Sequence, residues 1–168
     1  MHKSLLLLLF VLLLSAVYFI FRVYFAKDTA GLQKKLQSFD DLTDRQQVQI
    51  QVGQKVMTVE VVNTPQSTTL GLSGRDKIGA DGMLFIFPQQ QIRYFWMKDM
   101  QFDIDIVWIA NNQVIEVTQA VPKPAENTPD YRLQTYSATS EVNMVLELPA
   151  FAAQTYGISS GDTVQLLQ

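Results

Sequence analysis

From residue 47 onward, apolar and polar residues alternate with a period of two, the pattern of β-strands that bury one face. The first such segment, QVQIQV, places Val48, Ile50 and Val52 on one face. Gly53-Gln54 follows as a two-residue turn with glycine first, and the segment KVMTVEVV then resumes the alternation. The pattern predicts a β-hairpin over residues 47–62.

Two short helices are predicted beyond the hairpin. Thr64-Pro65 has the residue types of an N-cap followed by the first helical position, and this helix is expected to end at Gly74. A second helix is expected from Pro149 to Tyr156, before Gly157.

The rest of this region is expected to form short strands between turns. Asp81-Gly82 is a turn that leads into MLFIF, which Pro88 should stop, and Asn111-Asn112 is a second turn. The other expected strands cover residues 92–98, 101–109, 113–119, 145–148 and the C-terminus after Ser160-Gly161-Asp162. The fold class predicted for residues 47–168 is therefore mainly β, a β-sandwich or barrel-like domain with two short helices.

The N-terminus has a different pattern, an uninterrupted apolar run. Residues 4–21, SLLLLLFVLLLSAVYFIF, carry no charge and as a helix would extend about 27 Å, close to the hydrocarbon thickness of a bilayer. The run ends in aromatic residues, which suit a membrane interface better than a peptidase site. Residues 1–25 are expected to be an uncleaved N-terminal transmembrane anchor, with a cleaved signal peptide as the alternative.

The orientation and the link to the domain follow from this anchor. Basic residues flank the apolar run almost equally, but a short N-terminal tail usually stays inside the cell. We therefore expect a single-pass protein of the cell membrane with an extracytoplasmic C-terminal domain. Residues 26–46 are interpreted as a juxtamembrane stalk, with a membrane-facing helix as the alternative.

Composition excludes several kinds of chemistry. The chain has 168 residues, a formal net charge of -3 and no local cluster of lysine and arginine, so nucleic-acid binding is not expected. There is no cysteine, which excludes disulfides, thiolate zinc sites and thiol nucleophiles. The single histidine, His2, excludes a histidine-based triad or an HExxH zinc site within one chain. We expect no cofactor and no metal.

Six short motifs occur in a characteristic order along the chain. They are GLSGR (71–75), GMLFIF (82–87), FWMKDM (95–100), the aspartate of FDIDIVWI (102–109), VLELPA (145–150) and GISSGDTV (157–164). Together, over residues 50–168, they resemble the domain of unknown function 192 family. The resemblance implies a β-sandwich-like single domain that is often exported, and it implies no established reaction.

The chain also departs from this family at two places. The family usually has an asparagine-threonine pair where this chain has Asp99 and Met100, and a proline-leucine pair where it has Asp103 and Ile104. Asp105 matches the family pattern. Asp99 and Asp103 are therefore additions of this chain.

Three aspartates in an otherwise apolar segment are the first candidate site. Alternation places Asp103 and Asp105 on one strand face, opposite the core residues, with Asp99 near the strand entry. The simplest interpretation is a solvated sheet face, or one aspartate paired with Arg75 or Lys98. One alternative is a calcium site, although no DxDxDG loop is present.

Further candidates come from the charged and aromatic residues around these aspartates. Arg75 is interpreted as a structural ion-pair partner of Asp105, or else as a clamp for a carboxylate ligand. Glu147 lies in an apolar strand and, if buried, needs a cationic partner, for which Arg75 is the natural candidate. Tyr94, Phe95 and Trp96 suggest a surface for sugars or peptides, although Phe95 and Trp96 point to opposite faces. The candidate binding residues are Arg75, Trp96, Lys98, Asp99, Asp103, Asp105 and Glu147.

The sequence favours a ligand- or partner-binding module of the cell envelope over an enzyme. Its expected partners are the membrane, through the N-terminal helix, and a carbohydrate, a peptide or another envelope protein. The alternatives are an envelope hydrolase that uses a carboxylate pair from Asp103, Asp105 and Glu147, and a purely structural envelope protein.

Overall fold

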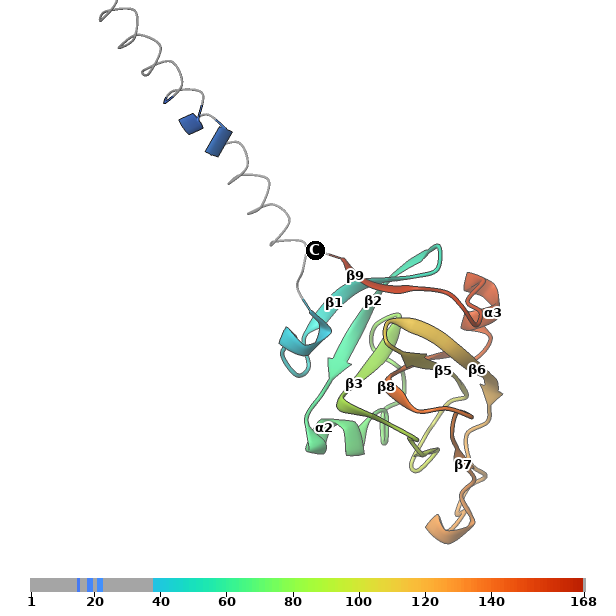
Figure 1. Cartoon of the computed structure of the whole chain (residues 1–168). Coiled ribbons are helices and arrows are strands. Elements are labelled where there is room, and N and C mark those ends of the chain that lie inside the picture. The colour runs from blue at the N-terminus through green and yellow to red at the C-terminus, as the bar shows by residue number, and fades with distance from the viewer. Residues whose placement is uncertain (1–14, 16–17, 20, 23–37, 168) are drawn as a thin grey trace, which may run out of the picture. The chain divides into compact units, whose positions relative to one another are not determined.

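The structure is a computed structural model that describes residue 15, residues 18–19 and 21–22, and residues 38–167 (Figure 1). The chain divides into two compact units, Met1–Gln37 and Ser38–Gln168. The expected anchor over residues 1–25 and the expected stalk up to residue 37 lie largely outside the described residues. Within the described ranges, no helix has the length and apolar character needed to cross a membrane.

The second unit is built on one mixed, seven-stranded sheet with the strand order β6-β5-β8-β3-β2-β1-β9. β2 and β3 pair in parallel, and the other neighbouring strands pair antiparallel. The strands are β1 (Gln47–Val52), β2 (Lys55–Val62), β3 (Gly82–Gln91), β5 (Ile104–Ala110), β6 (Gln113–Val121), β8 (Val142–Pro149) and β9 (Val164–Leu167). A small separate pair joins β4 (Phe95–Trp96) to β7 (Thr135–Tyr136). The predicted mainly β fold is confirmed.

The sheet curls until its two edge strands meet at one end. An isolated bridge joins Gln113 of β6 to Thr163, directly before β9. Next to it, the Val114 N–H donates to the carbonyl of Asp162 at 2.9 Å, and the Val164 N–H donates to the carbonyl of Asn112 at 2.8 Å. The sheet is therefore a half-barrel (Figure 1).

Apolar residues cover both faces of the curled sheet. The inner core takes residues from all seven strands, among them Ile50, Val59, Leu84, Val107 and Leu146. The outer core covers the other face and contains Phe85, Met97, Met100, Trp108 and Val145. Because β5 and β8 lie between the two cores, both of their faces are buried.

The two α-helices of this unit, α2 (Pro65–Leu70) and α3 (Ala152–Tyr156), are short. Thr64 caps α2 as predicted, since its hydroxyl accepts the Ser67 N–H at 3.2 Å. The helix ends at Leu70 instead of Gly74, because Gly71 turns the chain with a φ of 50°. α3 starts at Ala152, later than predicted, because Pro149 still belongs to β8.

Two strand boundaries also differ from the prediction. β3 continues past Pro88 to Gln91, because its register with β8 shifts between Ile86 and Gln91. Such an irregularity accommodates a proline, which has no N–H for the ladder. The strand expected over 92–98 is reduced to the two residues of β4.

The domain begins before the alternating pattern does. A 3-10 helix, η1 (Phe39–Asp41), precedes β1, and both Phe39 and Leu42 are buried in the inner core. The Asn63 amide donates to the carbonyl of Leu42 at 2.6 Å, and the Ser67 hydroxyl donates to Asp44 Oδ1 at 2.6 Å. Residues 38–46 therefore form part of the domain, although the sequence assigns them to the stalk.

Candidate functional site

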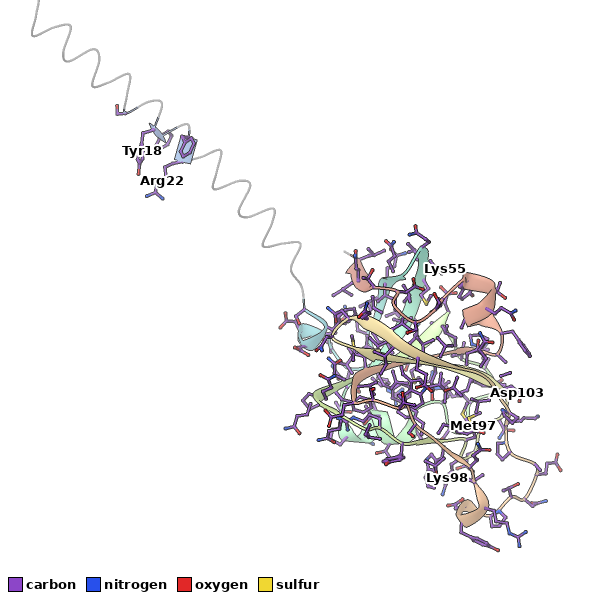
Figure 2. The ribbon with its side chains drawn as sticks, turned by 45° about the vertical axis from the view of Figure 1, so that its right-hand side comes forward. Tyr18, Arg22, Lys55, Met97, Lys98 and Asp103 are labelled. Atoms are coloured by element: carbon purple, nitrogen blue, oxygen red, sulfur yellow. The ribbon has the colours of Figure 1, made fainter. Side chains whose placement is uncertain are left out.

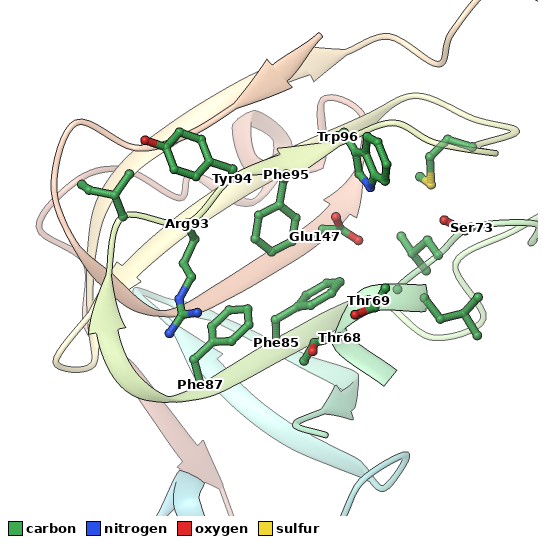
Figure 3. Close-up of a pocket in the computed structure, with 15 residues that line it drawn as sticks. Thr68, Thr69, Ser73, Phe85, Phe87, Arg93, Tyr94, Phe95, Trp96 and Glu147 are labelled. Carbon is green, nitrogen blue, oxygen red and sulfur yellow. The ribbon is translucent and has the colours of Figure 1, made fainter. Parts of the chain in front are cut away.

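A pocket of about 430 Å³ opens on the outer-core side of the sheet (Figure 3). Its walls come from α2 and the turn after it, from β3, and from the chain segment that leads through β4. Glu147 of β8 contributes the buried acidic group. The volume falls within the range of small-molecule sites, about 300–1,000 Å³.

Aromatic rings form most of the apolar wall. Strand alternation places Phe85 and Phe87 on the same face of β3. Phe95 of β4 lies against them, with its ring centroid 5.0 Å from that of Phe85 and 6.4 Å from that of Phe87, both edge-to-face. Trp96, 49% exposed, and the exposed Tyr94 also line the pocket. Edge-to-face contacts stabilise the packing of the three phenylalanine rings against one another.

Glu147 is the unusual group of the pocket. The residue is only 6% exposed, and its Oε2 has no hydrogen-bond partner. Burial raises the pKa of this carboxyl to about 8, because an ionised carboxylate is poorly stabilised away from water. Figure 3 shows the carboxyl group directed into the pocket. A buried carboxyl without a partner, at the base of a cavity, is a typical candidate for a functional group.

Arg93 is the cation of the pocket wall, and it does not neutralise Glu147. Its guanidinium lies over the ring of Phe87, 4.1 Å from the centroid, and Nη2 donates to the carbonyl of Gln89 at 2.6 Å. Its Nε is buried without a partner, and burial lowers the pKa of this side chain. In the described part of the chain, no ion pair joins Arg93 to Glu147.

Asp105 has a structural position that differs from the one predicted. It is 0% exposed and accepts three backbone N–H groups, from Ala120 (2.8 Å), Phe151 (3.0 Å) and Ala153 (2.9 Å). The expected ion pair of Asp105 with Arg75 or Lys98 is therefore wrong. The expected solvated sheet face is also wrong for Asp105, because both faces of β5 are buried.

Arg75 forms a structural ion pair, but with Glu60 of β2. The two side chains make a bidentate contact, Nη1 to Oε2 at 2.7 Å and Nη2 to Oε1 at 2.8 Å, and Arg45 adds a second cation 2.8 Å from Oε1. Hydrogen bonding to Arg75 lowers the pKa of Glu60. Arg75 is therefore a partner of neither Asp105 nor Glu147, which corrects both expectations.

The remaining charged candidates lie at the surface of the domain, and Figure 2 labels Lys98 and Asp103 among them. Lys98 pairs with Asp130, and its ammonium lies 5.4 Å from the ring centroid of Trp96. Asp103 is exposed and accepts the Lys123 N–H at 2.8 Å. Asp99, with a φ of 56°, is also exposed, and its carbonyl accepts the Gly74 N–H at 2.9 Å.

The strand register separates Asp105 from Glu147, one of the carboxylate pairs that the hydrolase alternative could use. Asp105 lies opposite Leu148 in the β5–β8 ladder, and Glu147 lies opposite Ile106. Residues directly opposite each other point to the same face, so Asp105 and Glu147 point to opposite faces of the sheet. Nor does any group of three histidine or acidic side chains among the described residues converge to hold a metal ion. Neither the Asp105–Glu147 acid–base pair nor the calcium site matches this geometry.

Residues 48–166 match the profile of DUF192, a family described as "Uncharacterized ACR". The chain belongs to the DUF192 family. This confirms the resemblance found in the motifs. No curated protein matches the chain.

Two solved structures share the fold of this DUF192 domain. One is a proposed transcription regulator from Sinorhizobium meliloti 1021, with a TM-score of 0.65 and 23% identity over 74% of this chain and 97% of that one. The other is a protein of unknown function from Novosphingobium aromaticivorans DSM 12444, with a TM-score of 0.63 and 23% identity over 74% of this chain and 89% of that one. At this identity the likeness describes the fold alone.

Two of the seven sequence candidates, Trp96 and Glu147, line the DUF192 pocket. Phe85, Phe87 and Arg93 also line the pocket and are not among the candidates from the sequence. Their period-two spacing in GMLFIF could have indicated that Phe85 and Phe87 share a face. Nothing in the sequence indicates that the segment after β3 folds back over them.

Proposed function

We propose that this DUF192 domain is a binding module for a small organic molecule and that the pocket above Glu147 is its site. The unpaired, buried carboxyl of Glu147 carries this proposal. A buried polar group without a hydrogen bond destabilises the fold by about 1–3 kcal/mol. A ligand that supplies the missing bond would recover that free energy as affinity.

The chemistry of the pocket suits binding better than turnover. The aromatic wall can bury the apolar body of a ligand, and Glu147 can fix its orientation. Asp105, the acidic residue on the neighbouring strand, points away and already accepts three N–H groups. Glu147 therefore has no second carboxyl from β5 with which to act as an acid–base pair.

The place of binding follows from the N-terminal sequence. An apolar, uncharged run over residues 4–21, which ends in aromatic residues, supports a single-pass anchor in the cell membrane. We include in the proposal that the anchor is not cleaved and that the domain lies on the extracytoplasmic side. The ligand would then be a molecule of the cell envelope or its surroundings.

A matched pair of helix variants tests whether the pocket binds. Thr69 is exposed on α2 and lines the pocket, so Thr69→Trp should fill it with little effect on the fold. Gln66 is exposed on the same helix outside the pocket lining, so Gln66→Trp is the control. We expect ligand-observed NMR with a mixed fragment library to find binders of the wild type and of Gln66→Trp that Thr69→Trp loses. Fragments that bind all three proteins alike, or no binders at all, would contradict the proposal.

A further inference from the structure

We propose that the ligand carries a protonated amine that bonds to the carboxyl group of Glu147, while the aromatic rings surround the neighbouring carbon atoms. This inference rests on the proposed function, because it assigns the ligand class of the same pocket. Glu147 is more than nine-tenths buried, it lines the pocket, and its Oε2 has no hydrogen-bond partner. Once ionised, the carboxylate can accept hydrogen bonds from an ammonium group.

The chain leaves Glu147 without a cation of its own. Arg75, the partner that the sequence suggests, is bound in a bidentate contact to Glu60. Lys98 pairs with Asp130 at the surface. Arg93 lies in the pocket wall, but its guanidinium donates to the carbonyl of Gln89 and stacks on Phe87. An external cation is thus the group that matches the acid of this site.

The wall has the properties of a cation site as well. The faces of aromatic rings carry partial negative charge and attract ammonium groups, more strongly where water is excluded. Phe85, Phe87, Phe95, Tyr94 and Trp96 all line the pocket. The stacking of Arg93 over Phe87 shows that this wall already holds one cation. A neutral donor could bond to the carboxyl group but would gain less from the rings than an ammonium group does.

Binding of an ammonium group should be coupled to proton release. Because the pKa of Glu147 is raised to about 8, the carboxyl holds its proton in the free protein at neutral pH. To form the ion pair, the ammonium ligand keeps its protons, Glu147 becomes a carboxylate, and the carboxyl proton passes to the buffer. The affinity should therefore rise by up to about tenfold per pH unit below this pKa and level off above it. A neutral ligand bound to the protonated carboxyl would instead bind equally well at all pH values below this pKa and more weakly above it.

Titration calorimetry of the full-length protein with phenethylammonium and its neutral analogue 2-phenylethanol tests this inference. Fragments of about ten non-hydrogen atoms bind in the millimolar range, which sets the concentration needed. We expect phenethylammonium to bind more tightly than 2-phenylethanol. Its affinity should rise from about pH 6 to pH 8, with release of close to one proton at the lower end. Glu147→Gln, which keeps the shape of the protonated acid, should lose this preference and the pH dependence.

The outcomes separate this inference from the proposed function. If 2-phenylethanol binds as tightly as phenethylammonium, or if the affinity for the amine does not rise with pH, the ammonium assignment is wrong and the pocket remains a binding site. The ammonium assignment is also wrong, and the pocket still a binding site, if neither probe binds while other fragments bind the wild type but not Thr69→Trp. If no fragment of any kind binds the pocket, both proposals fail. If Glu147→Gln does not fold, the pH dependence of phenethylammonium affinity in the wild type still tests the ammonium assignment.

Discussion

Oδ2 of Asp105 accepts the backbone N–H of Ala153 at 2.9 Å, across 48 positions of sequence. Oδ1 accepts two more N–H groups, from Ala120 and Phe151, and both of these residues have positive φ angles, 50° and 65°. The register of β6 against β5 shifts near Ala120, and α3 begins directly after Phe151. One buried carboxylate thus accepts N–H groups from a bulge, a strained turn and the start of a helix. The hydrogen bonds between neighbouring strands do not pair these N–H groups.

Asp105→Asn should therefore destabilise the domain by about 2–4 kcal/mol. The amide keeps one acceptor but turns an NH₂ group toward a buried N–H. Asp103→Asn is the matched control, since Asp103 is exposed and accepts a single N–H through one oxygen, which an amide can replace. It should change the free energy of unfolding by less than about 1 kcal/mol. Urea unfolding of the two variants measures both effects, and equal losses would contradict this role of Asp105.

Local sequence signals predicted the parts of the fold that local contacts determine. The hairpin of β1 and β2 and the Thr64 cap of α2 are where the sequence places them. Two of the wrong boundaries have different causes. Pro88 stays within β3 because the register of β3 with β8, a distant segment, shifts there. α2 ends before Gly74 because Gly71 already turns the chain. The parallel pairing of β2 with β3 and the contact between the sheet edges have no local signature.

The sequence predicts only part of the candidate site, because two of its seven candidates, Trp96 and Glu147, line the pocket. Glu147 was correctly singled out as an acid in an apolar strand, but its predicted partner, Arg75, pairs with Glu60. Alternation predicts which residues share a strand face. Ion pairs between strands depend on the order of the strands in the sheet, which the alternating pattern does not specify. For the same reason, alternation places Asp103 and Asp105 on one face, although in the structure Asp103 is exposed and Asp105 is buried.

The first residues of the domain should be required for its full stability. A fragment of residues 38–168 is expected to fold alone with a mainly β circular dichroism spectrum. A fragment of residues 47–168 lacks the buried side chains of Phe39 and Leu42 and the contact of Asp44 with Ser67. Each buried side chain of this size contributes about 1.5–3 kcal/mol, so the shorter fragment should be less stable by about 3–5 kcal/mol. Similar denaturation midpoints for the two fragments would show that residues 38–46 are a linker after all.

The stability of the domain should depend on pH through Glu147. The pKa of this carboxyl is about 8 in the folded protein, against 4.5 for an unperturbed glutamate. As the pH rises above 4.5 the unfolded chain releases its proton while the folded protein retains it, so stability is lost between these two values and then levels off. At about 1.4 kcal/mol per pH unit, the loss amounts to several kcal/mol. Glu147→Gln should remove this part of the pH dependence and be the more stable protein at the alkaline end. Parallel stability curves for the two proteins would contradict the raised pKa.

The proposed anchor makes a prediction about the mature protein. Full-length protein should remain with the membrane fraction in high salt, because a hydrophobic span is not released by charge screening. Mass spectrometry should find an N-terminus at or close to Met1. Recovery of a soluble form that begins near residue 27 would instead indicate a cleaved signal peptide.

The most direct test of Glu147 as the ligand anchor is the titration of its own carboxyl carbon, followed by NMR in the free protein and with saturating phenethylammonium. We predict a pKa of about 8 in the free protein. Bound ammonium should lower this pKa by about two to three units, since a cation in contact favours the ionised form. An unchanged Glu147 pKa at saturation would contradict the central claim that this carboxyl holds the ligand.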